Sequence, residues 1–154
     1  MTGCGASSTR SDPGHSGEHV TLTRKNKDMT LAVLHKHYVA DAHAHYGGGI
    51  LSGGFAMERF SDVATEMCVR HDGVEGMFAS YRSVQFKAPL YAGDIIEVEG
   101  ILGRVGSRSR DIDFELRVVA RRESRDSDRA SLLEPPLVAV TASGTVVVPP
   151  KVTA

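Results

Sequence analysis

The stretch GGGILSGGFAMERFSDVATEMCVRHDG, residues 47–73, decides the fold. It begins as a glycine-rich loop and continues with apolar residues three or four positions apart, which predicts an amphipathic helix from about Ser52 to Arg70. Ser52 is a suitable N-cap, and Gly73 is a suitable C-terminal stop. A long helix is therefore expected directly after a loop whose glycines let the backbone approach a ligand closely.

Extended segments surround this helix. Met29–Ala40 is expected as a strand before it, and alternating or β-branched patterns predict four strands after it, at 77–86, 95–102, 112–120 and 137–148. The charged stretch 121–136 is expected as an exposed loop. This order predicts an α+β fold, in which an antiparallel sheet of five or six strands wraps around one long central helix.

A single helix leaves part of such a sheet uncovered. An edge or a face then has to be buried against a second copy, so we expect a homo-oligomer, a dimer or higher. The chain of 154 residues has the size of one domain, expected at 28–150, and the polar segment 1–27 is expected as a flexible N-terminal tail.

The charge and the apolar runs exclude several classes of partner. The 18 basic and 19 acidic residues nearly balance, which argues against a nucleic-acid partner or attraction to an anionic membrane. No apolar run is long enough to span a membrane, and the N-terminus lacks the apolar core of a secretory signal. The two cysteines have no metal-site spacing, and a cytoplasmic location is expected.

Three motifs carry a resemblance to a known superfamily. Residues 86–94, FKAPLYAGD, look like the F-x-x-P-x-x-x-G-D turn of the hotdog-fold acyl-CoA thioesterases, dehydratases and lyases. The glycine-rich loop before the helix and the polar turn GRVGSRS, residues 103–109, match the same pattern. The resemblance implies the hotdog fold and a substrate that is an acyl-CoA thioester.

Within that superfamily, the chain is most similar to the 3-aminobutyryl-CoA and β-alanyl-CoA ammonia-lyases. The matching motifs lie within residues 42–118 and are AHYGG (44–48), DVATE (62–66), DGVEGMF (72–78) and PLYAGD (89–94). Such lyases reversibly remove ammonia from a β-aminoacyl-CoA to leave an enoyl-CoA. No cofactor is implied, since coenzyme A is part of the substrate. The alternatives are an acyl-CoA thioesterase, which directs water at the carbonyl carbon, and a non-catalytic acyl-CoA-binding module.

Elimination beside a thioester requires a base for the α-proton and a group that manages the leaving nitrogen. Asp62 and Glu66 are four residues apart on one helix face, and a carboxylate pair tends to split its pKa values into a base and an acid. The alternative is that both are solvated surface acids. His45, in the loop, is the third catalytic candidate, as a proton relay facing the site across a dimer interface.

The remaining candidates bind substrate. The N-terminus of the helix suits the thioester oxygen, with Ser52, Gly53 and Gly54 close to it. Tyr46, in the loop that faces the site, and Glu58, four residues before Asp62, are further candidates. Three basic residues are expected to hold the coenzyme phosphates: Lys87, Arg108 and Arg110. Four histidines lie between residues 35 and 45, but no HExxH motif or cysteine partner accompanies them, so no metal is expected.

Overall fold

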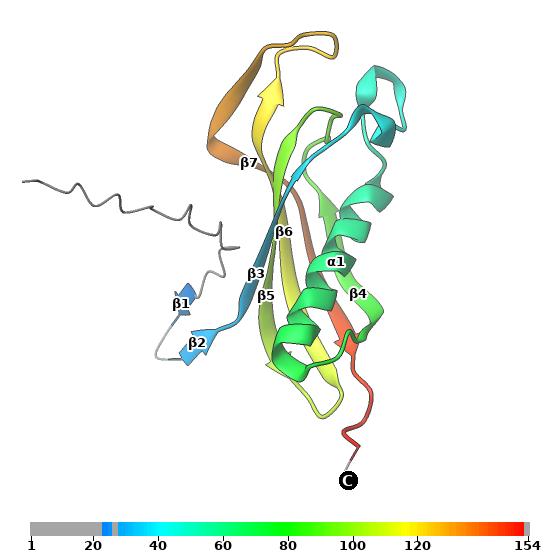
Figure 1. Ribbon diagram of the computed structural model, residues 1–154, viewed down its shortest axis with the longest axis vertical. Helices are drawn as coiled ribbons and strands as arrows, with labels where there is room; N and C mark the ends of the chain where they lie inside the picture. Colours follow the sequence, from blue (N-terminus) through cyan, green and yellow to red (C-terminus); the bar gives the residue numbers. More distant parts are fainter. Residues whose placement is uncertain (1–22, 26–27, 153–154) are drawn as a thin grey trace, which may run out of the picture.

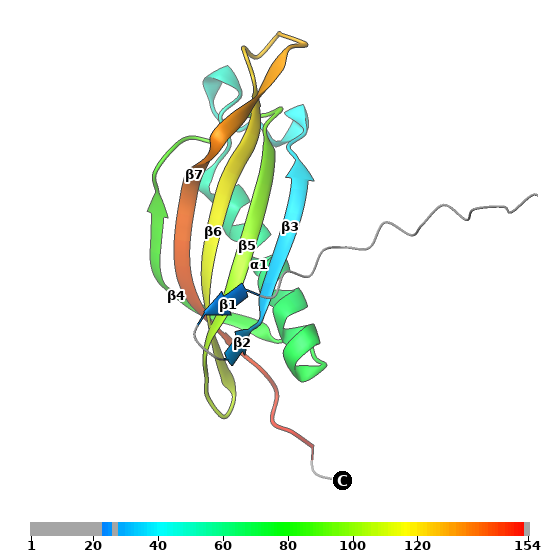
Figure 2. The same cartoon turned by 90° about the vertical axis from the view of Figure 1, so that its left-hand side faces the viewer.

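The computed structural model describes residues 23–25 and 28–152. Its main feature is a five-stranded antiparallel sheet that curves around one helix, α1 (Gly53–Asp72), as Figures 1 and 2 show. The strand order is β3-β5-β6-β7-β4, so β3 and β4 form the two edges. The strands are β3 (Ala32–Tyr38), β4 (Met77–Phe86), β5 (Ile95–Val105), β6 (Ser109–Arg122) and β7 (Ala130–Val147). The α+β architecture predicted from the sequence is confirmed.

A separate two-stranded sheet precedes the main one. Strands β1 (Thr23–Lys25) and β2 (Asp28–Thr30) pair antiparallel with each other. The expected tail therefore ends earlier than residue 27, because part of it forms β1. Residues 1–22 of that segment lie outside the described residues.

Helix α1 has the boundaries that its end residues favour. Ser52 occupies the N-cap position with extended backbone angles, although its side chain makes no capping hydrogen bond. Gly73 ends the helix in the left-handed conformation (φ +74°), and its N–H donates to the Val69 carbonyl. Because Gly73 lacks a Cβ, this conformation costs little there.

The core lies between α1 and the concave face of the sheet. Phe60 and Met67 of the helix are fully buried there together with Ile96 and Leu116 of the sheet. Full burial of each such side chain stabilises the fold by about 1.5–3 kcal/mol. The helix packs tightly on β5 at Gly100, where a Cβ would lie 2.6 Å from Val63 Cγ1. A side chain at Gly100 would push the helix off the sheet.

The stretch 121–136 differs from its expected loop. Strand β6 continues to Arg122 and β7 begins at Ala130, with Arg122 paired to Ala130 and Ala120 to Leu132. Most of the stretch is thus a β-hairpin that extends beyond the helix, and only residues 123–129 form its turn (Figure 1). None of the helices in the described part of the chain is long and apolar enough to cross a membrane.

Candidate active site

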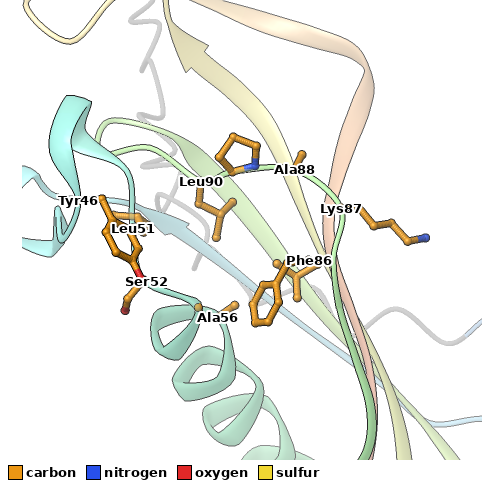
Figure 3. A pocket seen from close by; sticks show the side chains of 11 residues that line it. Tyr46, Leu51, Ser52, Ala56, Phe86, Lys87, Ala88 and Leu90 are labelled. Atoms are coloured by element: carbon orange, nitrogen blue, oxygen red, sulfur yellow. The ribbon is translucent and has the colours of Figure 1, made fainter.

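A cavity of about 450 Å³ lies at the N-terminus of α1 (Figure 3). One wall comes from the loop that enters the helix, and the opposite wall comes from the turn that follows β4. Its lining residues are Tyr46, Leu51, Ser52, Gly53, Ala56, Phe86, Lys87, Ala88, Pro89, Leu90 and Val140. This volume is in the range of small-molecule sites.

Backbone hydrogen bonds fix the two walls to each other. The Leu51 N–H donates to the Leu90 carbonyl, and the Ala92 N–H donates to the Gly49 carbonyl, both at 2.9 Å. Gly48 and Gly49 have φ values of +74° and +81°, a backbone conformation that side-chain-bearing residues rarely adopt. The glycines therefore allow the loop to turn sharply and then run beside the 90–92 segment as a short ribbon.

The helix end itself is open toward the cavity. The first N–H groups of a helix have no partner within the helix, and they carry the positive end of its dipole. The Ser52 side chain caps none of them, although the Ser52 carbonyl accepts the Phe55 N–H at 3.2 Å. The Phe86 ring closes over Gly53, where a Cβ would lie 2.8 Å from Phe86 Cζ. A thioester oxygen would thus meet amide donors in a pocket lined by an aromatic ring.

Four of the predicted binding residues line this cavity: Tyr46, Ser52, Gly53 and Lys87. Tyr46 and Ser52 lie next to each other on the loop side of the cavity and Phe86 lies on the opposite side, whereas the Lys87 side chain points away from the cavity (Figure 3). His45 is exposed, and its ring lies edge-on to Tyr46 with centroids 4.5 Å apart. Gly54 follows Gly53 in the first turn of α1 but does not line the cavity.

The predicted carboxylates Asp62 and Glu66 have different partners within one chain. Asp62 Oδ2 lies 3.4 Å from the Arg59 guanidinium, whereas Glu66 bonds His35 Nε2 at 2.5 Å and Arg70 Nε at 2.6 Å. The two carboxylates also begin about 14 Å and 20 Å along the helix axis from Gly53, at 1.5 Å per residue. Within a single chain, neither carboxylate reaches the cavity.

The environments of these carboxylates differ. Partial burial acts to raise the pKa of Glu66, but the hydrogen bonds from His35 and Arg70 outweigh it and leave this pKa lowered. Glu58 and Asp62 remain more open, with 65% and 48% of their side chains exposed, and both contact Arg59. The carboxylate of Glu66 is thus ionised and already hydrogen-bonded to two side chains, whereas the carboxylates of Glu58 and Asp62 remain accessible to solvent.

Two of the three basic residues expected at the coenzyme phosphates lie at the other end of α1. Arg110 is buried, and it donates from Nε (2.9 Å) and Nη2 (2.5 Å) to the Asp72 carboxylate. These bonds, against the effect of burial, hold the pKa of Asp72 below its usual value. Arg108 donates to the Val148 carbonyl at 3.1 Å. The assignment of Arg110 to phosphate binding is wrong, since its charge is already neutralised in the core.

Sequence reasoning missed the pair that supports the wall of the cavity. Asp94 is fully buried and bonds Arg121 of β6, which also donates to the Pro89 carbonyl. The available signal was the Gly-Asp that closes the 86–94 turn, because a buried carboxylate requires a cationic partner. The charged neighbours of Arg121 predict an exposed loop instead.

The comparisons with known proteins agree with this arrangement. A family model described as "Thioesterase superfamily" matches residues 48–124. The chain is 48% identical to a 3-aminobutyryl-CoA ammonia lyase of Acetoanaerobium sticklandii over 108 residues, 69% of this chain and 85% of that protein.

Solved structures agree as well. The structure of the β-alanyl-CoA:ammonia lyase from Clostridium propionicum matches with a TM-score of 0.75 at 32% identity, over 77% of this chain and 85% of that chain. A hexameric hotdog fold thioesterase of Campylobacter jejuni matches with a TM-score of 0.58 at 20% identity, over 73% and 78% of the two chains, which supports the fold alone. The resemblance found in the sequence motifs is therefore confirmed, and the chain belongs to the thioesterase superfamily and has its hotdog fold.

Proposed function

We propose that this protein is a β-aminoacyl-CoA ammonia-lyase, which reversibly eliminates ammonia from a 3-aminoacyl-CoA such as 3-aminobutyryl-CoA. The observation that carries this proposal is the cavity at the N-terminus of α1, found in a chain 48% identical to a lyase of that name. The cavity offers amide donors to a thioester oxygen and an apolar wall to a short acyl chain.

The reaction follows from the position of the thioester. Amide N–H groups at the helix end stabilise the negative charge that develops on the carbonyl oxygen when a base removes the α-proton. The electrons of the broken C–H bond form the Cα–Cβ double bond, and the ammonium group on Cβ leaves as ammonia. The base then passes its proton to solvent, so the products are enoyl-CoA, ammonia and a proton.

Asp62, from a second copy of the chain, is our candidate for the base. No carboxylate lines the cavity within the described part of one chain, yet Asp62 is ionisable, accessible and contacted by only one cation, Arg59. Glu58 shares that cation and is the second candidate, whereas Glu66 is already bonded on both sides. His45 packs against Tyr46, which lines the cavity, and is our candidate to carry the proton away.

The second copy docks along β4 in this proposal. This strand is an unpaired edge of the sheet, and in a single chain it exposes 72% of Met77 and 58% of Phe86. Unpaired edge N–H and C=O groups with apolar neighbours favour association with another strand. A dimer or higher oligomer would cover this edge, and one hotdog relative is named as hexameric. A coenzyme A substrate is consistent with a cytoplasmic location.

The test is the elimination itself. The purified protein is incubated with 3-aminobutyryl-CoA, while enoyl thioester, ammonia and free thiol are measured in the same sample. Equal amounts of enoyl-CoA and ammonia, with no free thiol, support the lyase. Free coenzyme A without ammonia instead supports an acyl-CoA thioesterase, the activity for which the superfamily is named. Binding without any product supports an acyl-CoA-binding module.

A further inference from the structure

A second cavity lies on the other side of the ribbon formed by 49–51 and 90–92. It has a volume of about 290 Å³, and its lining includes three arginines and two acidic residues, Asp94 and Glu123. The residues that form it are Gly48, Tyr91, Ala92, Asp94, Arg121, Arg122, Glu123, Ser124 and Arg125. We call it the arginine cavity. Leu90 lines the first cavity and Tyr91 lines this one, so consecutive residues of the ribbon contribute to the two cavities.

The three arginines of this cavity differ in how their charge is used. The charge of Arg121 is neutralised within the protein, because its Nε and Nη2 groups donate hydrogen bonds to Asp94 at 2.9 Å and 2.8 Å. Its guanidinium also lies over the Tyr91 ring. Arg121 therefore shapes the cavity without adding net charge to it.

Arg122 is held in a fixed orientation, with its charge only partly neutralised. It crosses the backbone at Gly93, where a Cβ would collide with its guanidinium. Its Nη2 donates to the Tyr38 hydroxyl at 2.8 Å and its Nη1 donates to the Arg125 carbonyl at 3.1 Å. Its carboxylate partner, Asp41, lies 3.2 Å away with a largely exposed side chain. The guanidinium is thus preorganised before any ligand arrives.

Arg125 supplies the uncommitted charge. Its side chain is exposed and makes no ion pair with any described residue. It lies along the glycine-rich loop, where a Cβ on Gly49 would be 3.7 Å from Arg125 Cδ. The loop that leads into the catalytic helix therefore passes directly beside an arginine that is free to bind an anion.

We propose, on the basis of the proposed function, that the arginine cavity binds phosphate groups of coenzyme A while the thioester occupies the cavity at the N-terminus of α1. Arg122 and Arg125 are the binding residues, because guanidinium forks match phosphate oxygens. The cavity has room for a phosphorylated head group but not for the whole coenzyme. The uncharged pantetheine arm crosses the ribbon, whose two segments are about 5 Å apart.

The experiment measures dissociation constants of coenzyme A, dephospho-coenzyme A and pantetheine by calorimetry on the full chain. Arg125→Gln and Arg122→Gln are compared with Arg129→Gln, which makes the same charge change in the same hairpin but outside the cavity. Arg125→Gln is expected to weaken coenzyme A about tenfold, the factor associated with one hydrogen bond between charged groups. Arg125→Gln should leave the dissociation constant of pantetheine and the thermal midpoint unchanged. Arg129→Gln should leave the dissociation constants of all three ligands unchanged.

Dephospho-coenzyme A identifies the phosphate that is bound. If Arg125→Gln weakens coenzyme A but not the dephospho form, the cavity holds the 3′-phosphate, and if it weakens both, the cavity holds the diphosphate. Equal effects of Arg125→Gln and Arg129→Gln on coenzyme A would overturn the proposal, as would equal weakening of coenzyme A and pantetheine. Amine addition to crotonyl-pantetheine, which lacks these phosphates, tests the lyase reaction separately. The lyase reaction can therefore be absent while phosphate binding in the arginine cavity is observed. Equally, the lyase reaction can be observed while phosphate binding is absent.

Discussion

The buried Asp94 and the half-buried Arg121 form an ion pair between the residues that line the two cavities. Both guanidinium bonds end on the Asp94 carboxylate, at 2.9 Å and 2.8 Å, and the same carboxylate accepts the Tyr91 N–H at 2.9 Å. Arg121 also donates to the Pro89 carbonyl at 3.0 Å. The pair thereby fixes the 89–91 turn. Pro89 and Leu90 of this turn line the cavity at the helix N-terminus, and Tyr91 lines the arginine cavity.

Asp94→Asn should lower the free energy of unfolding by about 3 kcal/mol, because it leaves Arg121 partly buried without its counter-charge. The measurement is urea denaturation at neutral pH. Asp113→Asn is the control, since Asp113 is exposed and accepts from Ser143 at the surface, and its effect should stay within about 0.5 kcal/mol. Equal effects of the two substitutions would contradict the bracing role of Asp94.

Gly53→Ala should reduce kcat/KM for crotonyl-CoA and ammonia by about tenfold or more. The added methyl group would meet Phe86 at 2.8 Å, so the ring has to move at the place where the thioester is expected. Gly47→Ala makes the same change within the loop, with no atom within 4 Å, and should have little effect. Similar kinetics for the two variants would place the reaction elsewhere.

Asp62→Asn should lower kcat by about 100-fold, the usual contribution of a general base. Glu66→Gln should have a much smaller effect on kcat, since the carboxylate of Glu66 is already bonded to His35 and Arg70. Steady-state rates of both variants, with thermal midpoints to establish folding, distinguish the roles. A larger loss of kcat in Glu66→Gln would transfer the role of base to Glu66.

Acidification should weaken the fold through Asp72. Its folded-state pKa is lowered, chiefly by the hydrogen bonds from Arg110. The pair therefore contributes stability above the unfolded-state pKa of about 3.9, and this stability is lost as the pH falls through the lower folded-state pKa. Asp72→Asn should cost about 3–5 kcal/mol at neutral pH and progressively less below pH 4. Denaturation from pH 7 to pH 2 measures this difference, and a constant difference would contradict the linkage.

Met77→Asp should dissociate the oligomer and abolish activity without unfolding the chain. Met77 is exposed in a single chain, and a charge at the β4 edge opposes pairing with a second copy. Leu132→Asp is the matched control, because Leu132 is equally exposed but lies on the β6–β7 hairpin, away from the β4 edge. Sedimentation velocity gives the masses, and an active Met77→Asp monomer would show that one chain completes the site.

The fold was predictable from local patterns because the signals were strong. The helix expected at 52–70 is observed as Gly53–Asp72, and its C-terminal end is set by Gly73. The strand expected at 77–86 has those bounds. In each case, the periodicity and the turn residues agree with the tertiary structure.

The partners of the charged residues in the site were less predictable, because these partners lie far away in the sequence and leave no local pattern. Arg110 finds Asp72 38 residues earlier in the chain, and Arg121 finds Asp94 27 residues earlier. An arginine in a polar stretch has the same local signature whether it is solvated, buried in an ion pair or free to bind a ligand. The charged residues of 121–136 likewise predict an exposed connection, although the ends of this stretch pair as part of β6 and β7.

The most direct test of the central claim is one incubation of the protein with crotonyl-CoA and ¹⁵N-ammonium, read by mass spectrometry. The account predicts a coenzyme A thioester that has gained one labelled ammonia, formed by the wild-type protein and formed more slowly by Gly53→Ala and, to a greater extent, by Asp62→Asn. Free coenzyme A and crotonate without any labelled adduct would contradict it, since water would then be attacking the carbonyl carbon at the N-terminus of α1.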